Sequence, residues 1–130
     1  MPYAAAVALT AGAADAQSAP PDAAFAGAIY AEACVKTHPS YGRATRVLRA
    51  NNFNSQGDGL WAHERSAMTV KVRRGRECSL LARISGTAER FTQSFIRTVA
   101  QRAVDARVTV VSASTQAPGG SVFFGAGIPR

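Results

Sequence analysis

Apolar and polar residues alternate on both sides of a short turn between residues 68 and 84, and this pattern limits the chain to folds that contain a sheet. On the first side, every second residue from Met68 to Val72 is apolar, and on the second side the same holds from Cys78 to Ile84. The residues between them, Arg74-Gly75-Arg76, are a turn signal. A period of two is typical of a strand with one buried face. We therefore predict an antiparallel hairpin with Cys78 on its apolar face.

Three other segments carry apolar residues at the three- and four-residue spacing of an amphipathic helix. The first helix is predicted over residues 23–37, after an N-cap at Asp22 and before Pro39. The second is predicted to start at a cap on Ser40 and to close near residues 51–52. The third follows Gly86-Thr87, and its apolar stripe consists of Phe91, Phe95, Val99 and Ala103.

Three further strands complete the predicted sheet. Leu60 to Glu64 is a weaker strand before the hairpin, and the segments from Val108 to Ala113 and from Val122 to Ile128 follow the third helix. The stretch from Asn54 to Gly59 is rich in turn formers and is predicted to be a loop. The element order is then ααβββαββ. This order predicts an α+β fold, with a mostly antiparallel five-stranded sheet and helices packed on one of its faces.

The alanine-rich first residues have the features of a secretory leader. A short apolar run ends in Ala14-Asp15-Ala16, where small residues stand at the positions that signal peptidase recognises. The run is far shorter than the roughly 20 residues that cross a bilayer as a helix. We therefore predict a signal peptide over residues 1–16, a flexible lead-in over residues 17–22, a single α+β domain over residues 23–130 and no transmembrane segment. The predicted location is the periplasm or the cell exterior.

The two cysteines, Cys34 and Cys78, fit this compartment. An even number of cysteines in a short exported chain is typical of a disulfide, because an oxidising space preserves the bond. Cys34 lies on the first predicted helix and Cys78 faces the core, so a bond between them would join the two layers. It would close a loop of about 45 residues and stabilise the fold by roughly 4 kcal/mol.

The chain resembles small exported proteins of proteobacteria that carry one cysteine in the first helix and a second in the hairpin. The matching residues are Ala33-Cys34, Met68-Thr69-Val70-Lys71-Val72 and Gly75-Arg76-Glu77-Cys78-Ser79-Leu80. The resemblance covers about half of the chain that follows the leader. It implies a periplasmic destination and a disulfide, and it carries over no catalytic residue and no ligand.

Familiar enzyme signatures are absent from the sequence. There is no Gly-x-Ser-x-Gly elbow, P-loop, His-Glu-x-x-His motif or complete glycine-rich dinucleotide fingerprint. His63 and Glu64 are adjacent on a predicted strand and should point to opposite faces, which prevents them from acting as an acid–base pair. We interpret His63 as a surface histidine on an edge strand. The sequence thus predicts a protein that is not an enzyme and uses no cofactor.

One alternative function is metal binding. Cys34 and His38 are four residues apart on one helical face, and His63 and Cys78 could complete a tetrahedral site of two sulfur and two nitrogen ligands. Against this, Pro39 directly follows His38 and should fray the helix there. Two thiols that lie close together in an oxidising space should also form a disulfide rather than remain thiolates. Metal binding is therefore the second hypothesis.

The chain is strongly basic, with 15 Lys and Arg residues against 8 Asp and Glu residues. Loss of residues 1–16 would remove Asp15 and no base, which makes the mature chain more basic still. If the strand registers are as predicted, the solvent face of the hairpin carries one continuous positive patch that consists of Lys71, Arg73, Arg74, Arg76 and Arg83. Such a patch favours anionic partners, although a basic face that only keeps the surface solvated is the simpler interpretation.

We therefore predict a small periplasmic binding or interaction domain whose partner is an unknown protein or an anionic envelope component. Nucleic-acid binding is the third hypothesis, and it rests on the hairpin and on the stripe of Arg43, Arg46 and Arg49. Exported proteins rarely meet nucleic acid, and no aromatic residues that could stack on bases are interleaved with these arginines. Nucleic acid is thus the less favoured anionic partner.

Overall fold

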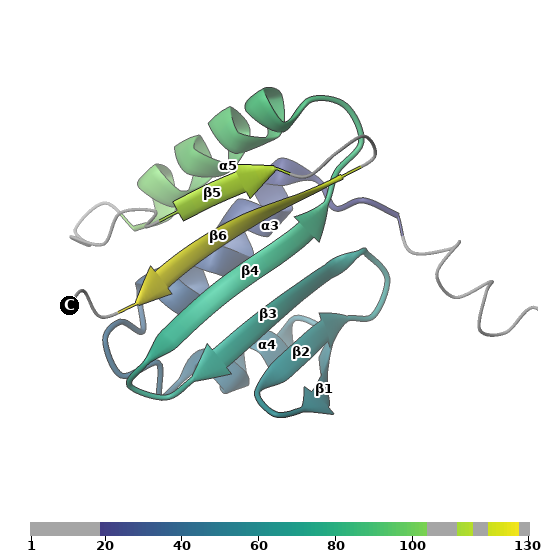
Figure 1. Cartoon of the computed structure of the whole chain (residues 1–130). Coiled ribbons are helices and arrows are strands. Elements are labelled where there is room, and N and C mark those ends of the chain that lie inside the picture. Colours follow the sequence, from purple (N-terminus) through teal and green to yellow (C-terminus); the bar gives the residue numbers. More distant parts are fainter. Residues whose placement is uncertain (1–18, 104–111, 116–119, 128–130) are drawn as a thin grey trace, which may run out of the picture.

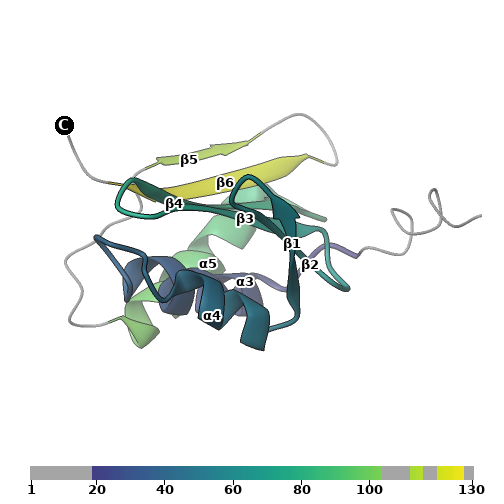
Figure 2. The ribbon, with the colours of Figure 1, turned by 90° about the horizontal axis from the view of Figure 1, so that it is seen from below.

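The computed structural model describes residues 19–103, 112–115 and 120–127. The fold is α+β, with an antiparallel sheet as one layer and the helices as a second layer on one of its faces (Figures 1 and 2). The fold class and the packing predicted from the sequence are therefore confirmed. The predicted leader lies outside the described residues. The described part of the lead-in contacts the turn between residues 63 and 68, because the Ala19 carbonyl accepts a hydrogen bond from the Ala67 N–H over 2.8 Å.

The helical layer contains α3 (Ala23–Tyr30), which continues directly into the π-helical turn η1 (Ala31–Val35), followed by α4 (Ala44–Ala50) and α5 (Ala88–Arg102). Asp22 caps α3 as predicted, because its carboxylate accepts a hydrogen bond from the Phe25 N–H over 3.3 Å. Thr87 caps α5 in the same way, with the Arg90 N–H as donor over 3.2 Å. Both caps satisfy backbone donors that the first turn of a helix leaves unpaired.

The second helix starts later than predicted. It begins at Ala44, whereas the sequence indicated a cap at Ser40. Tyr41 has a φ of 57°, which lies in the left-handed region and is incompatible with a right-handed helix. The Ser40 hydroxyl accepts a hydrogen bond from the Gly42 N–H over 3.1 Å and so stabilises a turn. Residues 36–43 are therefore a turn-rich connection between η1 and α4.

The sheet has six strands within the described residues, in the order β1-β2-β3-β4-β6-β5. They are β1 (Phe53–Gly57), β2 (Leu60–His63), β3 (Met68–Arg73), β4 (Glu77–Arg83), β5 (Ser112–Thr115) and β6 (Ser121–Gly127). All neighbouring strands are antiparallel. In the β3–β4 hairpin, Val70 lies opposite Leu80 and Val72 opposite Cys78, so the apolar residues share one face as predicted.

The strand β1 corrects the prediction of a loop from Asn54 to Gly59. Only Phe53 is buried in β1 and its other four residues are exposed, so no apolar alternation marks this strand in the sequence. A register shift between Ser55 and Gly57 interrupts the pairing further. The turn formers are used immediately afterwards, where three successive residues have positive φ, namely Gly57, Asp58 and Gly59.

The other predicted strands correspond to strands of the sheet where the structure describes them. Leu60 to Glu64 corresponds to β2, and Val122 to Ile128 corresponds to β6. Most of the strand predicted from Val108 to Ala113 lies outside the described residues, and β5 contains its last two positions.

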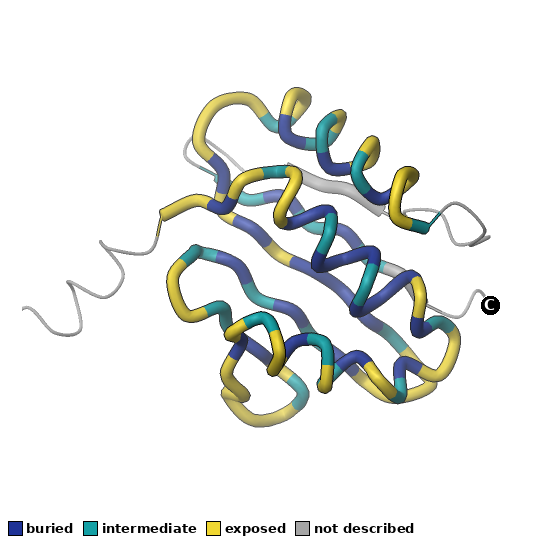
Figure 3. The backbone as a smooth tube through the Cα atoms, turned by 180° about the vertical axis from the view of Figure 1, so that it is seen from behind, coloured by how far each residue is buried: buried dark blue, intermediate teal, exposed yellow. Residues whose placement is uncertain are grey.

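The core lies between the sheet and the helices (Figure 3). At its centre Phe95 of α5 stacks on Phe124 of β6, with ring centroids 3.7 Å apart, and Tyr30 of α3 packs against both rings. The hydroxyls of Tyr30 and Tyr41 are buried and form no hydrogen bond within the described residues. Burial raises the pKa of both phenols above the usual value of 10.0. Both side chains therefore stay neutral and contribute to packing rather than to acid–base chemistry.

The helices α3 and α5 approach each other closely at Gly27. A Cβ atom at this position would lie 2.8 Å from the Phe95 carbonyl oxygen and 2.9 Å from the Thr98 Cβ. Protein interiors are close-packed, and neither neighbour is the flexible end of a long side chain. A larger residue at position 27 therefore requires the α5 backbone to move.

The substitution Gly27→Ala tests this close approach. Helix propensity alone would make alanine more stable by about 1 kcal/mol. We expect the opposite, a net loss of about 1–2 kcal/mol in the free energy of unfolding, because the two helices must separate. Urea denaturation of the oxidised protein measures the difference, and Ala24→Gly on the exposed side of α3 gives the propensity term alone. A Gly27→Ala protein that is more stable than wild type would contradict the close packing.

Candidate anion-binding site

The predicted disulfide joins the helical layer to the sheet. The Sγ atoms of Cys34 and Cys78 are 2.01 Å apart, their Cα atoms are 5.3 Å apart, and both side chains are fully buried. Cys34 lies in η1, where the Lys36 N–H donates to the Ala31 carbonyl, five residues earlier, over 2.9 Å. The Thr37 hydroxyl donates to a carbonyl of the same turn. Two hydrogen bonds thus stabilise the wide turn from which the disulfide begins.

The structure does not bring the four candidate metal ligands together. Both sulfur atoms belong to the disulfide, so neither can serve as a thiolate ligand. His38 packs edge-on against Tyr41 with ring centroids 5.7 Å apart, whereas His63 packs against Phe25 and Phe53 at 5.3 and 5.0 Å. In the part of the chain that the structure describes, no group of three His, Cys, Asp or Glu side chains could hold a metal ion. The predicted two-sulfur, two-nitrogen arrangement is therefore wrong for the oxidised protein.

His63 supports the turn between β2 and β3. Its Nδ1 accepts hydrogen bonds from the backbone N–H groups of Arg65 (3.2 Å) and Ser66 (3.0 Å), so Nδ1 carries no proton in this arrangement. Burial is the main cause that lowers the pKa of His63 below 6.5, the Arg65 charge lowers it further, and the Glu64 charge opposes both. The interpretation of His63 as a surface histidine is corrected, because its ring is partly buried and bound to the backbone.

The role of His63 predicts a pH dependence of stability. Its pKa is lower in the folded protein than in the unfolded chain, so its contribution is present above about pH 6.5 and is lost as the pH falls through the folded pKa. We expect the free energy of unfolding of wild type to fall between pH 7 and pH 5. His63→Ala should be less stable by about 1–2 kcal/mol at pH 7 and should lack this part of the decrease. Chemical denaturation at both pH values measures it, and equal pH slopes in the two proteins would contradict the role.

The turn between β3 and β4 carries a compact set of arginines, which we call the basic tip and which consists of Arg73, Arg74 and Arg76. The tip is held against the connection before α4, because the Gly75 N–H donates to the Ser40 carbonyl over 2.8 Å. Arg73 forms an ion pair with Glu77 over 3.4 Å. Arg74 and Arg76 are exposed and form no ion pair within the described residues. Two positive charges of the basic tip are thus available to a partner.

The five basic residues predicted for one patch do not lie together. Lys71 faces away from the helices on β3 and extends the basic tip along the strand. Arg83 is the last residue of β4, at the opposite end from the tip and about 20 Å from Glu77 at the usual rise of a strand. Leu81 lies between them and is 42% exposed. The predicted continuous patch is therefore corrected to the basic tip with Lys71, while Arg83 is separate.

In the structure the basic tip lies beside the connection before α4, whereas the sequence analysis assigned those residues to a longer helix. A Cβ atom at Gly42 would lie 3.4 Å from the Arg74 Nη2, so the Arg74 guanidinium lies beside the connection before α4. Arg43, which directly follows, flanks the start of that helix. Helical spacing assigned Arg43 to the solvated stripe of a longer helix. Gly42 could have indicated that the helix begins later, because glycine is unfavourable inside a helix.

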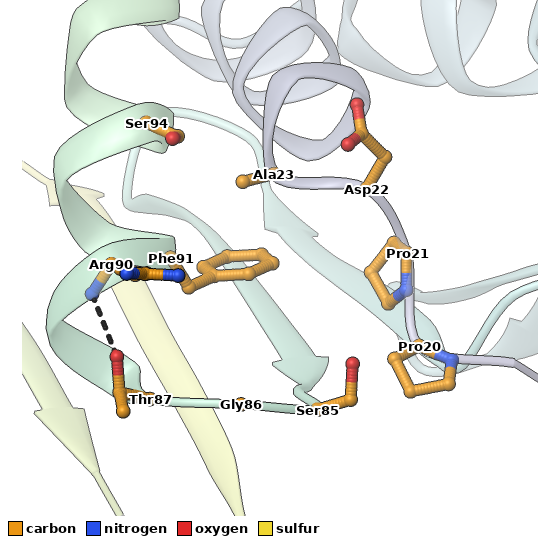
Figure 4. Close-up of a pocket in the computed structure, with 10 residues that line it drawn as sticks. All are labelled: Pro20, Pro21, Asp22, Ala23, Ser85, Gly86, Thr87, Arg90, Phe91 and Ser94. Atoms are coloured by element: carbon orange, nitrogen blue, oxygen red, sulfur yellow. Dashed lines mark hydrogen bonds between the residues drawn. The ribbon is translucent and has the colours of Figure 1, made fainter.

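A surface pocket of about 460 Å³ lies between the Pro20-Pro21 segment and the start of α5 (Figure 4). Figure 4 shows the Phe91 ring projecting from α5 toward α3, where it forms an apolar wall. Arg90 and Asp22 bring opposite charges to the lining, and Asp22 already caps α3. The pocket contains none of the predicted site residues, and its mixed charge gives it no preference for anions.

Comparisons of the chain with protein-family models, with curated proteins and with solved structures found no match. Within the described residues, every helix is too short or too polar to cross a membrane. The function must therefore be inferred from the residues and geometry of the chain itself.

Proposed function

We propose that this protein is an exported binding domain, without enzymatic activity, that binds an anionic component of the cell envelope through the basic tip. The observation that carries the proposal is the pair of exposed arginines, Arg74 and Arg76, on a turn that a backbone hydrogen bond to Ser40 holds in place. A guanidinium group recognises carboxylate and phosphate oxygens through two parallel hydrogen bonds. A fixed turn loses less conformational entropy on binding than a mobile one.

The charge around the basic tip supports an anionic partner over a neutral one. Glu77 is engaged by Arg73, and Lys71 lies on the same strand face as Arg73. The charges of Lys71, Arg74 and Arg76 therefore lie close together while the negative charge of Glu77 is engaged. Such a cluster of positive charge raises the local concentration of anions. Nucleic acid shares this chemistry but is rarely present outside the cytoplasm, so an envelope polymer or an anionic lipid is favoured.

Export is proposed on two grounds. The first is the leader pattern that ends in Ala14-Asp15-Ala16. The second is the buried disulfide between Cys34 and Cys78, which is compatible with an oxidising compartment and uncommon in a reducing one. Both grounds point to the periplasm or the cell exterior as the place where the basic tip would meet its partner.

Export and oxidation are tested together by intact mass. We expect the periplasmic protein, expressed in a Gram-negative host, to begin at Gln17 and to have the mass of a chain with one disulfide. N-terminal sequencing and mass spectrometry under non-reducing, thiol-alkylating conditions measure both properties. Periplasmic material that starts at Met1 would contradict the leader, and two alkylated cysteines would contradict the disulfide.

Binding is tested with phosphatidylglycerol vesicles and the double variant Arg74→Ser/Arg76→Ser. Each basic residue near an anionic surface contributes about 1 kcal/mol, so we expect affinity to fall roughly 10- to 30-fold. Wild-type affinity should also fall as NaCl rises from about 0.1 M to 1 M, because the Debye length shortens from about 10 Å to 3 Å. Co-sedimentation measures the affinity, and urea denaturation should show little change in stability, because exposed charges contribute little to it.

The matched control is Arg90→Ser/Arg97→Ser, which removes the same charge from exposed positions on α5. This control should lose less than threefold in affinity, since the effect depends on position and not only on net charge. Equal losses in the two variants, or no binding by wild type at low salt, would show that the basic tip is only a solvated surface.

A further inference from the structure

A second basic site lies on the helical layer, in a pocket between η1 and α4. The pocket has a volume of about 380 Å³, which is at the small end of the range of about 300–1,000 Å³ for ligand pockets. Its lining is rich in cations and consists of Glu32, Lys36, Thr37, Arg43, Arg46 and Val47. None of these residues belongs to the basic tip or to the disulfide.

The acid in this lining is already engaged by two cations. A carboxylate oxygen of Glu32 lies 2.9 Å from the Lys36 Nζ and 3.4 Å from a guanidinium nitrogen of Arg102. One negative charge is therefore shared between two positive ones. It leaves little negative potential to offset the two arginines of the lining, Arg43 directly before α4 and Arg46 within it.

Among the described residues, no acid forms an ion pair with either of those two arginines. Arg43 and Arg46 are exposed, are three residues apart at the start of α4, and form no ion pair within the described residues. Like charges at this spacing repel each other and destabilise a helix slightly. A bound anion between them would remove this repulsion and would accept hydrogen bonds from both guanidinium groups.

We propose that this pocket binds a single phosphate group, either as free phosphate or as the phosphate of an ester such as a lipid headgroup. Arg43 and Arg46 are the principal donors, and Lys36, directly after η1, contributes further positive charge. A guanidinium pair matches the oxygens of a phosphate, whereas a larger polyanion is the type of partner that suits the exposed basic tip. The site does not depend on the function of the basic tip, because its ligand is a small anion and its residues lie on other elements.

The proposal is tested by titrating the oxidised full-length protein with inorganic phosphate at constant ionic strength. Backbone amide shifts in NMR spectra report on binding at each residue. We expect saturable shifts centred on residues 32–47 in wild type, and at least a tenfold loss of affinity in Arg43→Gln/Arg46→Gln. Arg90→Gln/Arg97→Gln removes the same charge from α5 and should change the affinity less than twofold. Arg74→Ser/Arg76→Ser should likewise keep its phosphate affinity, which separates this site from the basic tip.

The variant Glu32→Gln gives an effect of opposite sign. It removes the negative charge from the pocket and releases Lys36, so phosphate should bind at least threefold more tightly. Its exposed ion pairs contribute little to stability, so the variant should remain folded. A structural role of Glu32 alone would not increase phosphate affinity.

Parallel titrations with glycerol phosphate and with phosphatidylglycerol vesicles identify the source of the phosphate. Saturation by both phosphate and glycerol phosphate supports a site for one phosphate group. Vesicle binding that remains in Arg74→Ser/Arg76→Ser and is lost when Arg43→Gln/Arg46→Gln is added to that variant assigns the phosphate to a lipid headgroup. Shifts that rise linearly without saturation, or an equal loss in the α5 control, would overturn the proposal. Binding to vesicles without binding to either small phosphate would also overturn it.

Discussion

The bond between Cys34 and Cys78 is the constraint on which the rest of the arrangement depends. It joins two residues 44 positions apart and encloses α4, the strands β1 to β3 and the whole basic tip. Closing a loop of this length stabilises the fold by roughly 4 kcal/mol, a large fraction of the stability of a small domain. Both proposed anion sites lie inside this loop or at its border, whereas Arg83 lies outside it. Reduction would therefore loosen the segments that carry the basic residues before it affected α5.

The sequence predicted the elements whose periodicity reflects burial. The helix α5 places Phe91, Phe95 and Val99 on one side and starts at a threonine cap, and the hairpin alternates around Cys78. In both cases one face packs on the core and the other is solvated. The spacing of the apolar residues therefore predicts the type of secondary structure. The bridge followed from the same reasoning, because an inward strand position and a core-facing helix position each offered a sulfur atom.

The features that the sequence could not predict depend on where a segment lies in the fold and not on the burial of its side chains. The strand β1 lies at the sheet edge with only Phe53 buried, so backbone pairing, which leaves no mark on side-chain pattern, defines it. The connection before α4 depends on the left-handed backbone of Tyr41. Likewise, alternation showed that Arg83 and Lys71 share a face, but only the length of β4 shows that they lie at different ends of it. The pocket between η1 and α4 is lined in part by Glu32 of the π-helical turn, which no apolar pattern indicates.

The order of strands in the sheet has a consequence for how the chain folds. The strand β6 follows β5 in sequence but lies between β4 and β5 in space. Until β6 is in place, β4 has an open edge next to Leu80 and the buried cysteine, and an unpaired edge of this kind can pair with another chain. The strands β1 to β4 are joined by short turns and can form early. The open edge of β4 is covered only by residues from Ser121 onward. A chain that stops short of β6 would therefore present an aggregation-prone half-sheet, and pairing with β6 decides how long the edge of β4 stays exposed while the domain folds.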